Sequence, residues 1–279
     1  MCPKLFQIGP IPVYSFGLMV AIAFLVANYF FTKEVKRKGY SEELASTITI
    51  FAFFFGLLGS KLFSIFENFG DFLENPVGTF FSPSGLTFYG GLLLSIVAIL
   101  IYLRAKNIPF LKIADAAAPS LIIAYGLGRL GCHFAGDGDY GLPSKLPWAM
   151  GYPKGTVPTL SAQNNELAAA FLKMYPGEPL PVDIAVHPTP VYEFIASIII
   201  FTLLWKLRLQ PKMAGWLFGI YLVLAGIERL LVEFIRLNPL YAGLSQAQWI
   251  SIGMILVGSI LAFLKNNKES QPGKVKLAV

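Results

Sequence analysis

The sequence predicts an all-α integral membrane protein with seven transmembrane helices and a small external head between the fourth and fifth spans. Hydrophobic residues make up 55% of the 279 residues and charged residues 14%, with a mean hydropathy of +0.63. A soluble domain has about 45–50% apolar and about 25% charged residues. Stretches of about 20 apolar residues, long enough to cross a bilayer, recur along the chain. These observations exclude a soluble globular protein, a disordered chain and a coiled coil.

Seven stretches qualify as spans and form one polytopic domain over residues 1–279. The fourth is the weakest, because it contains Pro119, several glycines and Arg129. We expect no cleavable signal peptide, since the first apolar stretch is long and a basic cluster follows it. The spans run from about 16 to 32, 44 to 66, 86 to 103, 116 to 135, 189 to 205, 214 to 235 and 248 to 264.

Basic residues predict the orientation of these spans. Lysines and arginines follow the first, third, fifth and seventh spans, whereas the connection after the second holds only acidic charges. By the positive-inside rule the N-terminus lies outside and the tail, 265–279, lies in the cytoplasm. The formal net charge of +6 is therefore an orientation signal and no sign of nucleic-acid binding.

The segment 136–188 is the one large external excursion. It is rich in proline and glycine, and Ser161 is expected to cap a short helix whose packed face carries Leu167, Ala168, Phe171 and Leu172. The chain has two cysteines, which excludes a disulfide-rich scaffold and a four-cysteine metal site.

We single out six charged residues within predicted spans or at their ends, all in the outer half. Each costs about 2.5–3.5 kcal/mol at a helix centre on insertion scales, so such groups face the bundle interior or a wet cavity. Two interpretations stay open: a structural ion-pair ladder along the sixth span, or an anion site, since guanidinium groups suit phosphate. The six are Arg129, Glu193, Glu228, Arg229, Glu233 and Arg236.

Both histidines of the chain lie near these charges. His133 falls between Arg129 and Asp137 at helical spacing, so the three share one face while the helix lasts. The Gly-Asp-Gly-Asp run that follows is typical of a turn and lacks the pattern of a calcium loop. His187 opens the segment HPTPVYE before the fifth span, and Tyr89 precedes Gly90 and Gly91 in the third.

Four segments resemble the phosphatidylglycerol–prolipoprotein diacylglyceryl transferases of bacteria, over nearly the whole chain. They are GRLG at 128–131 with its Gly/Asp continuation, HPTPVYE at 187–193, ERLLVEFIR at 228–236 and LSQAQ at 244–248. The resemblance implies a protein of the bacterial cytoplasmic (inner) membrane. It would transfer the diacylglyceryl group of phosphatidylglycerol to the lipobox cysteine thiol of a preprolipoprotein, releasing glycerol phosphate.

The resemblance also implies roles for particular residues. Arg129 and Arg229 match the family's two essential arginines, which would hold the lipid phosphate and stabilise charge on the leaving group. No metal or cofactor is implied, because the phosphate ester already supplies the leaving group. Further contacts with phosphatidylglycerol are expected at Gly90, Gly91, Asp137, Glu193, Glu233 and Arg236.

The chain departs from the family pattern at the proposed base. Tyr89 stands where the family has a histidine, Cys132 where it commonly has an asparagine, and Phe16 where it often has a tyrosine. A free thiol has a pKa of about 8.5, so a base or a positive field is needed to raise the fraction of reactive thiolate. Tyr89, His133 and His187 are the candidate bases, and activation by the arginines alone is the alternative.

Two other functions use the same residues. A transporter or flippase for an anionic lipid would need comparable charges in the inner half of the spans, and the predicted spans offer none. A catalytically inactive relative is supported by the missing histidine before Gly90. The expected partners are phosphatidylglycerol, preprolipoprotein signal peptides and membrane lipid, and no nucleic acid.

Overall fold

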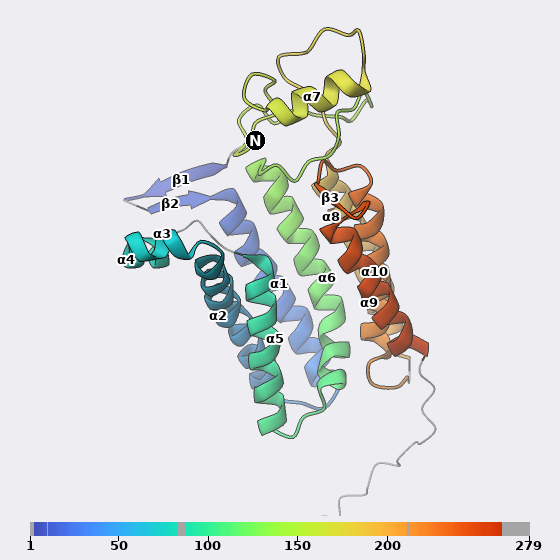
Figure 1. Cartoon of the computed structure of the whole chain (residues 1–279). Coiled ribbons are helices and arrows are strands. Elements are labelled where there is room, and N and C mark those ends of the chain that lie inside the picture. The colour runs from blue at the N-terminus through green and yellow to red at the C-terminus, as the bar shows by residue number, and fades with distance from the viewer. Residues whose placement is uncertain (1–2, 10, 83–86, 211, 264–279) are drawn as a thin grey trace, which may run out of the picture.

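Long helices that run side by side make up most of the molecule (Figure 1). The computed structural model describes residues 3–9, 11–82, 87–210 and 212–263, so the predicted tail, 265–279, lies outside the described residues. The elements are β1 (Lys4–Ile8), β2 (Ile11–Tyr14), α1 (Ser15–Arg37), α2 (Glu42–Glu67), α3 (Phe69–Glu74), α4 (Pro76–Phe81), α5 (Phe88–Ala105), α6 (Phe110–Ala135), α7 (Asn165–Met174), α8 (Thr189–Leu207), α9 (Trp216–Glu233), β3 (Leu240–Tyr241), β4 (Leu244–Ser245) and α10 (Gln246–Phe263).

Six of the described helices are long and apolar enough to cross a membrane, namely α1, α2, α5, α6, α8 and α10. They correspond to six of the seven predicted spans. The remaining predicted span is α9, which packs against α6, α8 and α10 in the same bundle. It is not among the six because its eighteen residues include three charged ones, Glu228, Arg229 and Glu233. The chain is therefore a multi-pass membrane protein.

Small residues let the helices approach closely. α6 packs against α1, α8 and α9, while α2 pairs with α5 and α9 with α10. A Cβ placed on Gly90 of α5 would overlap Phe63 and the carbonyl of Gly59 on α2, and Gly219 and Gly258 bring α9 and α10 together in the same way. Close backbone contact of this kind is how helices associate in a bilayer, where apolar burial offers little between them.

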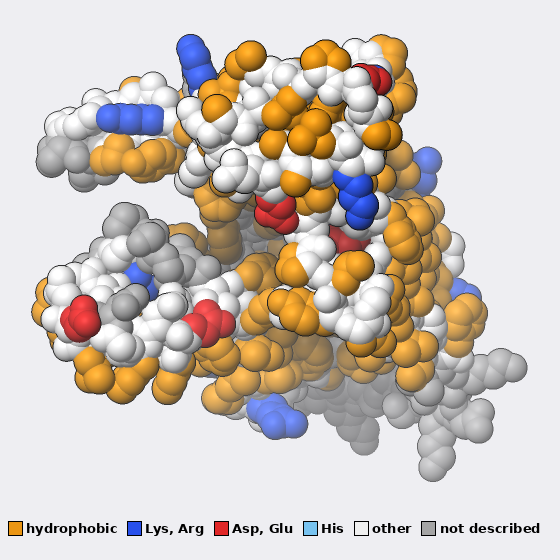
Figure 2. All heavy atoms as spheres, turned by 45° about the horizontal axis from the view of Figure 1, so that its top comes forward, with side chains coloured by type: hydrophobic (Ala, Val, Ile, Leu, Met, Phe, Trp, Pro, Cys, Tyr) orange, Lys and Arg blue, Asp and Glu red, His pale blue; other side chains and the backbone are white. Residues whose placement is uncertain are grey.

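The flanks of the bundle are apolar. Figure 2 shows hydrophobic side chains covering one flank below the looped segment that contains α7. Leu25, Ile101, Ile199 and Phe263, from four different helices, are among the exposed large hydrophobic residues. In water an apolar surface of this extent would favour association, whereas lipid tails solvate it.

Residues 136–188 form a lobe at one end of the bundle, around α7 (Figure 1). Its core is one cluster of Tyr140, Tyr152, Leu167, Ala168, Phe171, Ile184 and Val186. The helix here was predicted correctly, but its cap was not. Asn164, rather than Ser161, accepts the hydrogen bond from the backbone N–H of Leu167 at 3.0 Å, and Leu172 is exposed. The capping position shifts because the chain still turns at 161–163.

The end of the bundle away from the lobe holds a charge cluster that the sequence analysis did not predict. Glu34 of α1 is buried, and its carboxylate pairs with Arg37 at 2.7 Å and with Arg208 at 2.6 Å. Asp115 of α6 accepts hydrogen bonds from the backbone N–H groups of Gly215 and Phe218 and so caps α9. These contacts tie α1, α6, α8 and α9 together where the helices end.

Candidate functional site

Three helices bring buried charges together where the bundle meets the lobe. Glu193 lies in the second turn of α8 and has no exposed surface. Its Oε1 atom accepts hydrogen bonds of 2.7 Å from Arg229 Nη1 of α9 and from the Tyr125 hydroxyl of α6. Arg129 Nε of α6 lies 3.4 Å from the same oxygen. The two predicted arginines, distant in sequence, therefore converge on one carboxylate oxygen.

Local chain geometry places these residues. α6 ends at Ala135 because Gly136 adopts the left-handed conformation (φ 57°), and its N–H caps the carbonyl of Cys132. α8 begins with a proline in its first turn, where the missing N–H costs nothing. The Thr189 hydroxyl donates a hydrogen bond to the carbonyl of Asp139 at 2.5 Å, so the start of α8 is fixed to the segment that leaves α6.

Asp139 forms a second point of convergence, directly beside the first. Its two carboxylate oxygens pair with Arg129 and with Arg236. Burial alone would raise the pKa of Asp139, but the two guanidinium groups outweigh burial and lower that pKa to about 2. Asp139 is therefore ionised at neutral pH and holds α6 to the segment that follows α9.

The ion-pair ladder predicted along the sixth span exists only in part. Arg229 Nη2 lies 3.2 Å from Glu233 Oε2, as the spacing of four residues predicts. α9 ends at Glu233, however, so Arg236 leaves the helical face and turns to Asp139 instead. Among the described residues, Nε and Nη1 of Arg236 have no hydrogen-bond partner although both atoms are buried, and Glu193 Oε2 is 3.9 Å from Nη1.

Each of the two histidines contacts a tyrosine hydroxyl. His133 Nδ1 lies 3.0 Å from the Tyr152 hydroxyl, and His187 Nδ1 lies 3.3 Å from the Tyr192 hydroxyl. Burial lowers the pKa of His187, which favours its neutral form. The face expected to join Arg129, His133 and Asp137 is broken, because α6 ends before Asp137.

The contact between α5 and α2, apart from the arginine site, contains Gly90 and Gly91, which follow Tyr89. These residues begin α5, where Gly90 and Gly91 lie against Gly59, Ser60 and Phe63 of α2. Close helix packing therefore accounts for the two glycines. In the part of the chain that the structure describes, the Tyr89 ring contacts Phe88, and no hydrogen bond links Tyr89 to Arg129 or Arg229.

Sequence reasoning missed three polar residues, two of them at the site. Asp139 was assigned to a turn, although two carboxylates beside an arginine were already visible in the Gly-Asp-Gly-Asp run. Tyr125 lies one helical turn before Arg129, and that spacing was the available sign. Lys61 was not counted among the charges within spans, but it lies inside α2, is buried, and donates a hydrogen bond to the Ser82 carbonyl at 2.9 Å.

The comparison with known proteins places the chain in a family. The sequence model of the prolipoprotein diacylglyceryl transferases matches residues 3–264. The chain belongs to the prolipoprotein diacylglyceryl transferase family. A relative from Clostridium tetani, named phosphatidylglycerol–prolipoprotein diacylglyceryl transferase, is 31% identical over 92% of this chain and 95% of its own length. Relatives of the same name from Bordetella avium and Aliivibrio salmonicida are 30% and 34% identical, over 96% and 91% of this chain and 96% and 82% of their own lengths.

Membership in the prolipoprotein diacylglyceryl transferase family fits the geometry at the lobe end of the bundle. Arg129 and Arg229 are bidentate, permanently charged donors, and both are largely buried. Every arginine at this site is paired with a carboxylate of Asp139, Glu193 or Glu233. An incoming anion must therefore compete with these carboxylates, which hold the guanidinium groups in place without a ligand.

Proposed function

We propose that this protein transfers the diacylglyceryl group of phosphatidylglycerol to the lipobox cysteine thiol of preprolipoproteins. The product is a thioether, and glycerol phosphate is released. The observation that carries the proposal is the convergence of Arg129 and Arg229 on Glu193 Oε1. Two guanidinium groups from different helices, held at one point, suit the oxygens of a phosphodiester. The names of the relatives support the same substrates.

In this proposal the two arginines bind the phosphate and stabilise the leaving group. As the bond between the glyceryl carbon and the phosphate oxygen breaks, negative charge grows on that oxygen, and preorganised cations lower the barrier. Glu193 and Glu233 orient Arg229, while Asp139 orients Arg129 and Arg236. Removal of one such preorganised donor costs about 10²–10³ in rate in other enzymes.

We further propose that α9 also crosses the membrane, which gives seven spans, that the lobe is an external head, and that the protein resides in the bacterial cytoplasmic membrane. Basic residues at both ends of the connection between α5 and α6 and after α8 support a cytoplasmic position for the end opposite the lobe. The lobe end, with the buried arginines, would then face outward, where phosphatidylglycerol and a signal peptide can meet.

The test is a reconstituted transfer reaction. Purified protein is incubated with phosphatidylglycerol vesicles and a synthetic lipobox peptide, and thioether product and released glycerol phosphate are quantified together. We expect both products in equal amounts from the wild type and neither from Arg129→Ala or Arg229→Ala. Lys154→Ala, an exposed basic residue of the lobe, is the control and should keep full activity. Absence of both products from the wild type would contradict the proposal and favour an inactive lipid-binding relative.

A further inference from the structure

The proposed transfer must remove a proton from the substrate thiol, and we propose that the carboxylate of Asp137 accepts it. This inference rests on the transferase function above and adds a residue to its mechanism. Tyr89, His133 and His187 were the side chains that the sequence nominated for this step. Their described contacts are with Phe88, Tyr152 and Tyr192, and none of them has a hydrogen bond or ion pair with an arginine among the described residues.

Asp137 is positioned by the turn that ends α6. Gly136 and Gly138 on either side of it have φ angles of 57° and 92°, a conformation that glycine adopts without strain. The turn is closed by a hydrogen bond from the backbone N–H of Asp139 to Asp137 Oδ1 at 3.4 Å. The carboxylate of Asp137 is thereby held at the junction of bundle and lobe, where a peptide emerging from the membrane can reach it.

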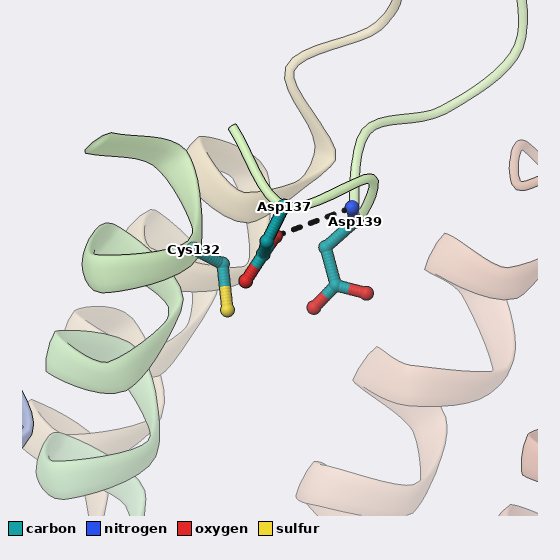
Figure 3. A group of neighbouring side chains, drawn as sticks. All are labelled: Cys132, Asp137 and Asp139. Atoms are coloured by element: carbon teal, nitrogen blue, oxygen red, sulfur yellow. Dashed lines mark hydrogen bonds between the residues drawn. The ribbon is translucent and has the colours of Figure 1, made fainter. Parts of the chain in front are cut away.

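A thiol already lies beside this carboxylate. Figure 3 shows the Cys132 sulfur and the Asp137 carboxylate pointing toward one another, with the carboxylate of Asp139 next to them. One donor atom from each of the three residues lies within 4.8 Å of the others. Both carboxylate oxygens of Asp139 already pair with guanidinium groups. The three residues are therefore better suited to proton transfer than to holding a cation. The Cys132 side chain shows that a thiol fits against Asp137.

The proton acceptor must also lie close to the reacting carbon. The ion pairs of Asp139 connect the turn that carries Asp137 to the arginines of the proposed phosphate site. Asp139, next to Asp137, pairs with Arg129 and Arg236. A phosphate held by Arg129 would therefore lie next to the turn that carries Asp137 and Asp139. The Arg236 side chain is 94% buried, yet its Nε and Nη1 atoms have no hydrogen-bond partner among the described residues, and Nη1 has only the Glu193 carboxylate at 3.9 Å. These donors point to a site built for an oxygen-rich ligand at this position.

Asp137 differs from Asp139, Glu193 and Glu233, because no ion pair joins it to an arginine in the described part of the chain. Its side chain is half-buried and so remains reachable. The charged and titratable groups around it are Asp139, Cys132, Arg129 and Tyr152. Burial, and then the negative charge of Asp139, raise the pKa of Asp137. A raised pKa strengthens the carboxylate as a base and brings it nearer to the pKa of a thiol, about 8.5.

The proposed step breaks an S–H bond and a C–O bond and forms a C–S bond. The S–H bond of the substrate cysteine breaks, and its proton moves to the Asp137 carboxylate. The thiolate forms a C–S bond with the glyceryl carbon while the C–O bond to the phosphate breaks, and the electron pair leaves with the phosphate oxygen. The anion that departs is glycerol phosphate, stabilised by Arg129 and Arg229. The proton on Asp137 is then lost to water.

The test compares the pH dependence of kcat/KM for the wild type, Asp137→Asn and Asp137→Glu in the reconstituted reaction. We expect Asp137→Asn to lower kcat/KM at pH 7 by about 10²–10⁴, the usual contribution of a general base. Its rate should then rise about tenfold per pH unit toward the thiol pKa, about 8.5, since hydroxide replaces the base. The wild type should level off at a lower pH, and Asp137→Glu should recover part of the activity.

Two further measurements separate a base from a residue that only binds lipid. A lipobox peptide with selenocysteine, which ionises below neutral pH, should restore the rate of Asp137→Asn toward that of the wild type, and binding of phosphatidylglycerol vesicles should be unchanged. Glu166→Gln, the same charge change at an exposed position of α7, is the matched control. An Asp137→Asn variant with the wild-type rate and pH profile, or one that selenocysteine fails to rescue, overturns the assignment. If the wild type itself forms no product, the proposed function fails instead.

Discussion

Arg229 of α9 donates a hydrogen bond from Nη1 to Oε1 of Glu193 on α8 at 2.7 Å. Glu193 has no exposed surface, and the same oxygen lies 3.4 Å from Arg129 of α6. One carboxylate therefore links three helices and holds both arginines at a single point.

Replacement of Glu193 by alanine should destabilise the bundle strongly. The change leaves the buried Arg229 with Glu233 alone and Arg129 with Asp139 alone, and breaking a buried pair costs about 3–5 kcal/mol. Tyr125→Phe removes only one hydrogen bond to the same carboxylate oxygen and should cost less, about 1.5–3 kcal/mol. Unfolding in detergent micelles measures both. A Glu193→Ala variant no less stable than Tyr125→Phe would refute the structural role of Glu193.

The stabilisation that Asp139 provides by pairing with Arg129 and Arg236 should change with pH only in acid. Because the folded pKa of Asp139 is about 2, below the ordinary 3.8, its stabilisation is fully present above the ordinary pKa and is lost as the pH falls toward 2. The difference in unfolding free energy between wild type and Asp139→Asn should therefore be constant from pH 7 to about 5 and shrink below about 4. A difference that disappears already near pH 6 would contradict the assignment.

Gly90→Ala should weaken the pairing of α2 with α5. The added methyl group would overlap Phe63 and the backbone of Gly59, and overpacking of a close contact costs about 1–3 kcal/mol. Gly253→Ala in α10 is the matched control, because a Cβ at that position meets nothing within 4 Å. Thermal unfolding should show a lower midpoint for Gly90→Ala alone. Equal midpoints for the two variants would show that α2 and α5 do not pack as described.

Glu34→Gln should destabilise the end of the bundle opposite the lobe. The Glu34 side chain is 1% exposed and binds Arg37 and Arg208, so its loss leaves two cations without their partner, at a cost of about 3–5 kcal/mol. Glu42 pairs with Lys36 nearby, but its side chain is 60% exposed, and Glu42→Gln should change stability by about 0–1 kcal/mol. Denaturant titration of both variants compares the two costs, and similar values would argue against a buried network at Glu34.

The helices could be predicted from the sequence because each is a local property. A run of apolar residues, bounded by charges or prolines, marks a span whatever its neighbours are. α1, α2, α5, α6, α8 and α10 appear where those runs occur. Arg129, Glu193 and Arg229 were also identified from the chain alone, because a charge within a span is costly and must have a partner.

The partners themselves were decided by tertiary structure. Helical spacing indicates that Arg229 and Glu233 share a face, but it cannot indicate that Glu193, 36 residues earlier, faces Arg229 from α8. The expected pairing of Arg236 with Glu233 was wrong for the same reason. Where α9 ends, the helical spacing no longer applies, and the arginine turns to Asp139, 97 residues earlier.

The sequence by itself therefore determined that this chain crosses a membrane several times and places arginines, carboxylates and histidines near one end of its helices. Only the tertiary structure decided that the arginines pair with Glu193 and Asp139, that the histidines contact tyrosines, and that Asp137 lies beside a thiol. The physical reason is that the apolar length of a helix is a property of its own segment of the sequence. The direction of a charged side chain depends on which helices pack together, and that is set by close contacts between residues far apart in the chain.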